Sequence, residues 1–503
     1  MRANQNLYRC LRAQFPEDSK RPFLTTEDER SVSYRDLDMH SAQLAHALTR
    51  LGVRPGDRVT VLVEKTVESV FLYLACLRAG FVYHPLNPGY TESEVLYFLS
   101  NAEPKAVICA PGRLEEMKRA GSSAGVALFL TLDEFGLGSL MQEVDAEDTV
   151  FDPVHREGSD LAALLYSSGT TGKPKGIMLT HENLRKNAET LVEAWGFSDS
   201  DRLLHMLPIY HVHGLFVALH CVLMSGAQMA WRSRFDASSA IRALRACTVF
   251  MGVPTYYTRL LGDQGFTHAC CSSMRLFISG SAPLLSETFY EFKERSGHTI
   301  LERYGMTETG MNTSNPLRGE RRPGTVGPPL PGVEVRVVDP QGKAVPVGET
   351  GDLQVRGGNV FAGYWGMPER TAEDFTTDSF FNTGDQALID ANGYVSIVGR
   401  AKDMIITGGL NVYPKEIESV IDEMSSVAES AVIGLPDPDF GEKVVAVIVP
   451  VGVGPSPGSV IDHCRSVLAK FKVPKKIEFV DALPRNAMGK VQKNALRIQY
   501  DED

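Results

Sequence analysis

Apolar residues recur along the first 400 residues with two different periods, and segments of the two kinds alternate. Helical spacing of apolar residues predicts helices at 40–52, 69–80 and 182–195. Short apolar runs that end at turn residues predict strands at 57–63, 106–110, 161–168, 176–181, 248–254 and 276–280. This alternation is typical of α/β layers with at least one largely parallel sheet.

The pattern changes after about residue 315, where Pro and Gly become frequent. Short strands are then expected at 333–339, 351–357 and 393–399, which together predict a β-rich subdomain. Beyond residue 400 we expect helices at 414–424 and 459–471 and strands at 429–437 and 444–450. The expected fold class is α/β: a large N-terminal domain of layered α/β subdomains plus a β-rich subdomain, with a small C-terminal α+β domain.

The bulk composition narrows the class of partner. The chain has 503 residues, more than one hydrophobic core supports, so two or more domains are expected. Lys and Arg number 51 against 62 Asp and Glu, which gives a net charge of −11. This balance argues against nucleic acid or an anionic membrane as the main partner, but permits a local basic pocket for a small anion. We expect a small-molecule partner and a monomer or weak oligomer.

Cysteine usage and the N-terminus bear on the compartment. The eight cysteines are scattered without a CxxC pair, which favours a reducing compartment over a disulfide framework or a metal site. The longest apolar runs are too short to span a membrane. The basic N-terminus is faintly like a transit peptide but lacks its serine richness. A cytoplasmic protein is therefore expected.

The segment "SSGTTGKPKG" (167–176) combines glycines, hydroxyls and two lysines between two expected strands. Glycines let backbone N–H groups approach an anion, and hydroxyls and ammonium groups add donors and charge. The common phosphate loop leads from a strand into a helix and has Ser or Thr after its lysine, whereas Pro174 follows Lys173 here. On its own, the segment fits an anion-binding loop and a solvated polar hairpin equally well.

Seven motifs follow this loop along the chain. They are "LPIYHVHG" (207–214), "SGSAPL" (279–284), "RYGMTE" (303–308), "NTGD" (382–385), "GRAKD" (399–403), "GGLNVYPKEIE" (408–418) and "NAMGK" (486–490). In this order, and over most of the chain, the set resembles the acyl-adenylate-forming (AMP-binding) superfamily of acyl-CoA synthetases, luciferases and peptide-synthetase adenylation domains. Within the superfamily, the stretches around the first three motifs are most similar to the malonyl-CoA synthetases.

The resemblance implies a reaction in two steps. A carboxylate attacks the α-phosphorus of MgATP to give an acyl-adenylate and pyrophosphate, and a CoA thiolate then displaces AMP. ATP, Mg²⁺ and CoA are thus the implied cofactors and co-substrates. Residues 1–398 would form the AMP-binding domain, 399–403 a hinge that contains Lys402, and 404–503 a mobile C-terminal domain. Because both steps build negative charge, fixed donors and cations should dominate catalysis.

The implied catalytic residues are Lys490, Thr307 and His211. The Lys490 ammonium would draw the attacking carboxylate and the α-phosphate together, although without the resemblance it reads as an ordinary surface lysine. Thr307 would contact the α-phosphate, and His211 would lie between the acyl pocket and the CoA tunnel. Glu308 is the implied Mg²⁺ ligand, because a bridging hard cation relieves the repulsion between a carboxylate and a phosphate. Gly408 and Gly409 are the implied CoA contacts.

The implied ATP contacts come from the loop and the later motifs. Tyr304 would offer its ring to the adenine, and Asp385 would accept hydrogen bonds from the ribose hydroxyls; core packing and a turn cap are the alternatives. The full set is Ser167, Thr170, Thr171, Gly172, Lys173, Lys175, Gly280, Ser281, Ala282, Glu302, Arg303, Tyr304, Gly305, Met306, Thr307, Asp385 and Arg400.

Malonate, with methylmalonate as the second acid, would bury a distal carboxylate that needs a cation. Arg275, just before the strand 276–280, is the first candidate, and Arg303 is the second. Arg232 and Arg234 are weaker candidates. The expected substrate-contacting set is His211, Val212, Arg275, Ser279 and Met306, in which Val212 and Met306 would limit substituents at C2.

Other functions stay open from the sequence. The acid could be another short or medium-chain carboxylate. A peptide-synthetase adenylation domain would normally be followed by a carrier domain, and no room for one is expected after Asp503. A luciferase-like oxidation needs the same adenylate. A nucleotide-binding regulator without chemistry is disfavoured because the loop, Glu308, Asp385, Arg400 and Lys490 occur together.

Overall fold

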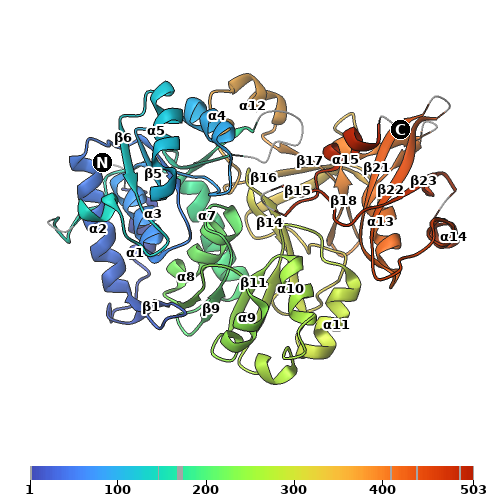
Figure 1. Ribbon diagram of the computed structural model, residues 1–503, viewed down its shortest axis with the longest axis horizontal. Helices are drawn as coiled ribbons and strands as arrows, with labels where there is room; N and C mark the ends of the chain where they lie inside the picture. The colour runs from blue at the N-terminus through green and yellow to red at the C-terminus, as the bar shows by residue number, and fades with distance from the viewer. Residues whose placement is uncertain are drawn as a thin grey trace. The chain divides into compact units, whose positions relative to one another are not determined.

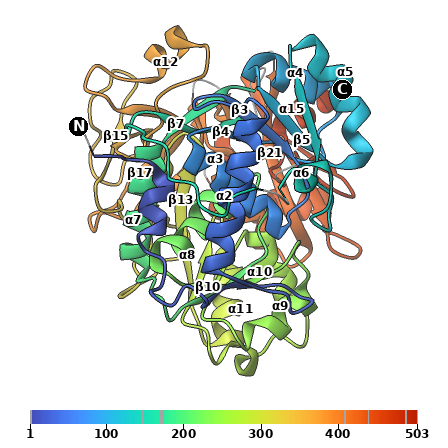
Figure 2. The ribbon, with the colours of Figure 1, turned by 90° about the vertical axis from the view of Figure 1, so that its left-hand side faces the viewer.

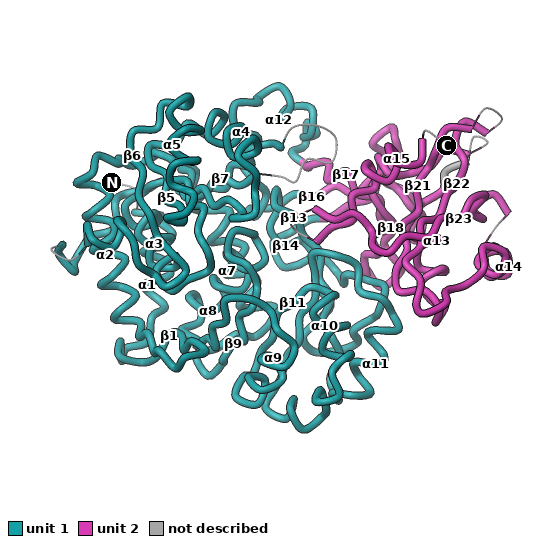
Figure 3. The backbone as a smooth tube through the Cα atoms, in the orientation of Figure 1, with its two compact units in different colours: residues 1–167, 174–334, 356–379 teal, residues 168–173, 335–355, 380–503 magenta. Residues whose placement is uncertain are grey.

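The computed structural model describes residues 3–144, 147–166, 174–407, 410–437, 440–468, 470–486 and 489–501. The chain divides into two compact units (Figure 3). Unit 1 comprises Met1–Ser167, Pro174–Glu334 and Arg356–Ser379; unit 2 comprises Ser168–Lys173, Val335–Val355 and Phe380–Asp503. The two units are described separately below.

One sheet of unit 1 has, within the described residues, six strands in the order β6-β5-β3-β4-β7-β8. Figure 1 labels β5 and β6 of this sheet. Its strands are β3 (Arg58–Leu62), β4 (Val82–Pro85), β5 (Ala106–Cys109), β6 (Leu128–Thr131), β7 (Leu161–Tyr166) and β8 (Gly176–Thr180). Neighbours from β6 to β7 run parallel, and β8 is antiparallel to β7. The expectation that the glycine-rich segment joins two strands is therefore confirmed, although residues 167–173 lie outside the described residues.

A second sheet of unit 1 has eight strands in the described part of the chain, in the order β14-β13-β12-β11-β9-β10-β1-β2. They are β1 (Pro22–Thr25), β2 (Ser31–Ser33), β9 (Arg202–His205), β10 (Gln228–Trp231), β11 (Val249–Gly252), β12 (Leu276–Ser279), β13 (Ile300–Met306) and β14 (Gly310–Ser314). The neighbours from β13 to β1 are parallel, and only the flanking pairs β13/β14 and β1/β2 among these described strands are antiparallel.

The helices of unit 1 pack against these sheets; α2 lies along α3 in Figure 2. They are α1 (Leu7–Arg12), α2 (Tyr34–Arg50), α3 (Val67–Ala79), α4 (Glu92–Ala102), α5 (Leu114–Ser123), α6 (Ser139–Gln142), α7 (His181–Trp195), α8 (Leu219–Ser225), α9 (Ala237–Leu244), α10 (Pro254–Leu261), α11 (Ser286–Ser296) and α12 (Pro368–Asp374). Shorter turns are η1 (Pro111–Arg113), the π-helix η2 (His213–Ala218) and η3 (His268–Cys271).

Helices α3 and α2 show where the apolar pattern predicted a helix and where it missed the start of one. Every residue of α3 is buried, as expected for a helix that is apolar on all sides. The helix expected at 40–52 starts six residues earlier, at Tyr34, because Ser33 and Asp36 form a capping box that satisfies backbone N–H groups. A core cluster beside the second sheet contains Phe250, Phe277 and Phe292, from β11, β12 and α11.

Unit 2 holds two further sheets. The first has the order β15-β16-β17-β18, with β15 (Val333–Val338), β16 (Gly351–Gly357), β17 (Phe381–Ile389) and β18 (Val395–Arg400). The second, in the order β20-β19-β22-β21 with β23 beside β22, contains β19 (Ile405–Thr407), β20 (Leu410–Val412), β21 (Val427–Asp437), β22 (Gly441–Pro450) and β23 (Lys476–Phe479). Its helices are α13 (Pro414–Asp422), α14 (Pro457–Val467) and α15 (Lys493–Tyr500), with short turns η4 (Ala401–Asp403) and η5 (Lys470–Lys472).

The expected α/β fold class, with a large N-terminal part and a C-terminal domain, is confirmed. The compact unit 2 includes the β-rich sheet as well as the C-terminal domain, because β16 and β17 pair across 25 intervening residues. The boundary at residues 398/399 and the hinge at 399–403 stay predictions. Over the described residues, no helix is both long and apolar enough to cross a membrane.

Asp422, at the end of α13, makes the stability of unit 2 depend on pH. Burial raises the pKa of Asp422 to about 6, even though Ser430 donates a hydrogen bond of 2.7 Å to its carboxylate. The folded chain therefore prefers the protonated acid, and this contribution to stability is lost as pH rises through about 6.

We expect Asp422→Asn to raise the free energy of unfolding by about 1–2 kcal/mol at pH 8, after allowance for partial exposure, and by much less at pH 4. Asn keeps an oxygen for Ser430. Thermal unfolding at the two pH values measures the difference, and Asp462→Asn, at an exposed acid, is the matched control. An equal gain at both pH values would contradict the assignment.

Candidate active site

The polar residues singled out in unit 1 gather where parallel strands end. β9, β11 and β12 end at His205, Gly252 and Ser279, and β13 continues to Met306. Since the carboxyl ends of parallel strands share one edge of a sheet, the loops after these strands meet there. This edge is where open α/β sheets bind ligands.

Arg303, on β13, is a buried cation at this edge. Its side chain is 3 % exposed, and its Nε and Nη2 atoms have no hydrogen-bond partner in the described part of the chain. The guanidinium packs against Gly280, where an added Cβ would lie 2.6 Å from Nε, so a larger residue would have to displace the guanidinium. Burial lowers the pKa of Arg303 to about 10, which leaves it cationic at neutral pH. A buried charge in this state is costly unless a ligand pairs with it.

Further buried polar atoms surround this cation. His213 Nδ1 lies 3.3 Å from the Ser281 hydroxyl, and Ser281 has a φ of 74°, a strained backbone conformation for a residue with a side chain. Burial, followed by the Arg303 charge, holds the pKa of His213 well below its usual range. His213 Nε2 and Ser279 Oγ have no partner among the described residues. His213 is not among the site residues expected from the sequence.

Arg275, the first sequence candidate for the distal carboxylate, is already paired. Its Nε and Nη2 atoms each lie 2.7 Å from a carboxylate oxygen of Asp201, and the carbonyls of Trp195 and Gly196 accept its other hydrogen bonds. Arg275 also precedes β12, whereas Ser279 ends it, so the two lie at opposite ends of the strand. The geometry favours Arg303 over Arg275.

The two weaker candidates have different surroundings. Arg232 lies 3.9 Å from Glu27, and Arg234 is exposed. Neither packs against Gly280 as Arg303 does.

The hairpin between β13 and β14 carries Thr307 and Glu308. A β-bulge lies between Tyr304 and Gly305. A Cβ added at Gly305 would collide with the Gly310 carbonyl. Tyr304 is half-buried, and Glu308 is 8 % exposed. Met306 pairs with Gly310 in register. The bulge thus turns the hairpin end toward the same sheet edge as the loop after β12.

The loop between β9 and η2 carries His211 and Val212. His211 is half-buried, and its Nδ1 accepts a 3.3 Å hydrogen bond from the His213 N–H. Val212 is buried, and with Thr307 and Phe216 it lines a small cavity. The expected contacts His211, Val212 and Thr307 therefore lie close together in unit 1.

Two residues of the expected ATP set have other partners. Glu302 is buried and accepts a 3.1 Å hydrogen bond from the Leu284 N–H, which fixes the end of the loop after β12. Lys175 lies 3.6 Å from the Asp374 carboxylate and 4.1 Å from the centre of the Tyr364 ring. Ser167, Thr170, Thr171, Gly172 and Lys173 lie outside the described residues.

Unit 2 carries the remaining candidates. Asp385 on β17 is buried and forms a 2.7 Å ion pair with Arg400 on β18. Burial lowers the pKa of Lys402 to about 8. Lys490 is exposed in a tight turn, where its backbone N–H donates to the Asn486 side chain. Gly408 and Gly409 lie outside the described residues.

The residues present fit the implied Mg²⁺. No group of three or more His, Cys, Asp or Glu side chains in the described ranges could hold a metal by itself. Mg²⁺ bound with substrate phosphates needs only one or two protein carboxylates, and the Glu308 carboxylate is of this kind.

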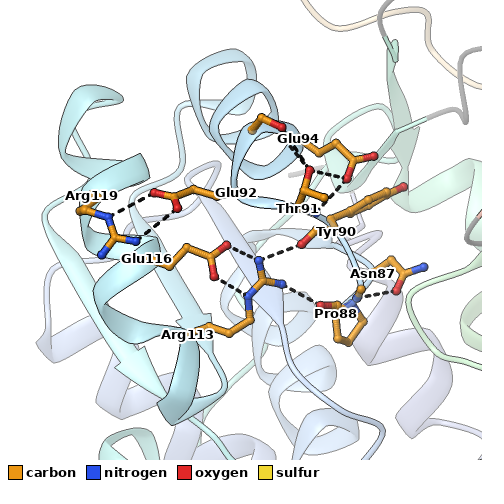
Figure 4. A network of polar contacts seen from close by, with 11 residues as sticks. Asn87, Pro88, Tyr90, Thr91, Glu92, Glu94, Arg113, Glu116 and Arg119 are labelled. Atoms are coloured by element: carbon orange, nitrogen blue, oxygen red, sulfur yellow. Dashed lines mark hydrogen bonds and ion pairs between the residues drawn. The ribbon is translucent and has the colours of Figure 1, made fainter.

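A cavity of about 270 Å³ in unit 1 lies beside Tyr210, next to His211. Its lining is partly aromatic and partly cationic, and includes Tyr83, Pro88, Lys65, Arg234, Phe235 and Tyr256. One wall is fixed by Arg113, whose guanidinium donates to the Pro88 and Tyr90 carbonyls at 2.7 and 2.8 Å and pairs with Glu116 (Figure 4). The lining also includes the acid Glu64, so it suits a flexible molecule with apolar and charged parts.

Comparison with known proteins decides the family. The family model described as AMP-binding enzyme matches residues 11–365, and that described as AMP-binding enzyme C-terminal domain matches residues 416–490. The chain belongs to the AMP-binding enzyme family. The resemblance found from the motifs is thus confirmed.

Several relatives of this AMP-binding enzyme are similar over nearly the whole chain. ATP-bound MatB from Rhodopseudomonas palustris is 49% identical, with a TM-score of 0.97 and 99% of each chain covered. A mitochondrial malonate–CoA ligase, ACSF3, from Mus musculus is 37% identical, covering 93% of this chain and 86% of the relative. A malonate–CoA ligase from Arabidopsis thaliana is 35% identical, covering 89% and 78%.

Proposed function

We propose that this AMP-binding enzyme joins malonate to CoA, with ATP converted to AMP and pyrophosphate. The observation that carries the proposal is the buried Arg303 guanidinium, whose Nε and Nη2 lack a partner within the described chain. A substrate with a second carboxylate can supply the missing anion. The names of the two malonate–CoA ligases among its relatives support the same acid.

Arg303 also accounts for selectivity among acids. A monocarboxylate such as acetate or octanoate uses its one carboxylate at the reacting end and would leave the buried cation unpaired. Leaving a buried charge unpaired costs several kcal/mol, so binding of such acids is weak. His213, Ser281 and Ser279 bring further polar atoms to the same sheet edge.

The first step forms malonyl-AMP. Lys490 draws the attacking carboxylate oxygen and the α-phosphate together, and Thr307 donates to that phosphate. Glu308 holds Mg²⁺, which neutralises phosphate charge when bound. The glycine-rich loop with Thr170, Thr171 and Lys173 grips the leaving pyrophosphate.

The remaining ATP contacts hold the nucleoside. Tyr304, with Gly280 and Ala282 on the other side, holds the adenine, and Asp385 with Arg400 holds the ribose.

The second step transfers malonyl to CoA. Gly408 and Gly409 contact the CoA chain after the C-terminal domain, residues 404–503, turns about Lys402, and His211 lies beside the path of the thiol. Val212 and Met306 restrict C2 to hydrogen or methyl. The eight free thiols suit a reducing compartment, so we propose a cytoplasmic enzyme.

The test is pyrophosphate release that depends on both the acid and CoA, with malonate, methylmalonate, acetate, octanoate and an aromatic acid compared. We expect kcat/KM for malonate to exceed that for acetate by at least about 100-fold, because an unpaired buried Arg303 costs about 3 kcal/mol or more. Glu308→Gln should raise the Mg²⁺ concentration needed for half-maximal rate. Faster turnover of acetate, octanoate or the aromatic acid would overturn the malonate assignment.

A further inference from the structure

Lys65 is a buried lysine that no motif pointed to. It follows β3, is 9 % exposed, and stands 4.1 Å from the centre of the Trp231 ring. Its Nζ lies 2.9 Å from His205 Nδ1, 3.0 Å from the His205 carbonyl and 2.7 Å from the Arg232 carbonyl. Burial, followed by the Arg232 charge, holds the pKa of Lys65 well below its usual range, whereas the three surrounding acceptors match the three N–H donors of an ammonium.

His205, the last residue of β9, connects Lys65 to the loop that carries His211, because its second ring nitrogen contacts that loop. Its side chain is 1 % exposed, and its Nε2 lies 2.9 Å from the Gly214 carbonyl. Because a carbonyl only accepts, Nε2 must carry the proton, and Nδ1 then accepts from Lys65. Burial, followed by the Lys65 charge, holds the pKa of His205 well below its usual range, so the imidazole is neutral.

Both the carbonyl and the N–H of the Gly214–Leu215 peptide are hydrogen-bonded. Its carbonyl accepts from His205 Nε2 and from the Leu219 N–H five residues later, which is the hydrogen bond of a π-helix. Its N–H donates to the His211 carbonyl at 2.9 Å. An added Cβ at Gly214 would collide with the Pro208 carbonyl, so the loop closes tightly on itself. π-Helical turns of this kind are frequently found at functional sites.

We propose that Lys65 and His205 are positioning residues that hold His211 in place through the Gly214–Leu215 peptide. This inference rests on the proposed function, because it assigns His211 to the acyl and thiol path. The Gly214 carbonyl requires the proton on Nε2, Lys65 donates to Nδ1 of that tautomer and holds the ring, the ring fixes the peptide plane, and the peptide fixes the backbone of His211. Lys65 also lines the cavity beside Tyr210, whereas His205 does not, so the His205 variants carry the test.

Three substitutions of His205 distinguish the role of the acceptor Nδ1 from the role of the donor Nε2–H. His205→Gln places an amide N–H near the position of Nε2 and keeps the donor to Gly214. His205→Asn keeps an acceptor for Lys65 and loses that donor, and His205→Phe loses both. We expect kcat to fall about tenfold or more for Phe and Asn, with the KM for ATP unchanged, and to recover to within about threefold of wild type for Gln. Equal losses in Gln and Asn would overturn the proposal.

A double-mutant cycle with His211→Ala tests whether His205 acts through His211. We expect His205→Phe to cost little further rate in the His211→Ala background, because the positioned group is already gone. Additive losses of kcat in the double variant would overturn the proposal that His205 acts through His211. Lys65→Met should lose about as much as His205→Phe, and the two together no more than either.

The matched control is His181→Phe. His181 is another buried histidine, and its Nδ1 accepts a 3.1 Å hydrogen bond from the Leu7 backbone N–H. It should lower thermal stability without changing kcat. If His205→Phe fails to fold, the Gln and Asn pair carries the test alone. A wild-type chain that uses another acid and not malonate overturns the proposed substrate only, and the same cycle is then run with that acid.

Discussion

Arg303→Met removes turnover of malonate while making the ligand-free protein more stable. Methionine has a similar volume without the charge, so the variant loses the partner of the distal carboxylate. We expect kcat/KM for malonate to fall at least about 100-fold, which corresponds to about 3 kcal/mol or more. The unpaired buried guanidinium disappears at the same time, so the free energy of unfolding without substrate should rise. Steady-state kinetics and thermal unfolding measure the two effects.

Arg275→Met is the matched control, and it should behave in the opposite way. Asp201 is 2 % exposed, so the variant buries a carboxylate whose guanidinium partner at 2.7 Å is gone. We expect lower thermal stability and an unchanged KM for malonate. Propionate, which has a methyl group in place of the distal carboxylate, should be used at least as well by Arg303→Met as by wild type. Loss of malonate turnover in Arg275→Met alone would reverse the assignment of the two arginines.

Lys490→Ala is expected to remove the first half-reaction and spare the second. Loss of a fixed cation beside developing charge costs about 100- to 1,000-fold in rate. Malonate-dependent exchange of pyrophosphate into ATP measures the first step, and thioester formation from synthetic malonyl-AMP and CoA measures the second. Because Lys490 is exposed in its turn, the substitution should not change thermal unfolding.

Lys493→Ala is the control for Lys490, three residues away in the same tail. Lys493 Nζ lies 2.6 Å from the buried Glu418 carboxylate, so its loss should lower the stability of unit 2 and leave adenylation unchanged. A Lys490→Ala variant that slows both half-reactions equally would contradict a role confined to the first.

The fold class was predictable because strand and helix periods alternate clearly in unit 1. The strands around the glycine-rich loop and the presence of α3 followed from the apolar pattern alone. β13 was not predicted, since "ILERYGM" mixes charged and apolar residues. Its register comes from β12 and β14, which lie on either side of it.

The candidate site was predictable as motifs and not as contacts. Nothing near Arg275 in the sequence shows that Asp201, 74 positions earlier, neutralises it. In the same way, Lys65 and His205 are 140 positions apart and belong to different sheets. Such pairings are set by tertiary packing, so the sequence ranked Arg275 above Arg303 and passed over a buried lysine outside any motif.

The pairing of β1 with β10 has a consequence for biosynthesis. Leu24 pairs with Met229, so 205 residues separate the two partners along the chain. At a ribosome speed of about 5–20 residues per second, β10 emerges about 10–40 s after β1. During this time the edge of β1 that will pair with β10 stays open. That edge must be shielded from pairing with strands of other chains.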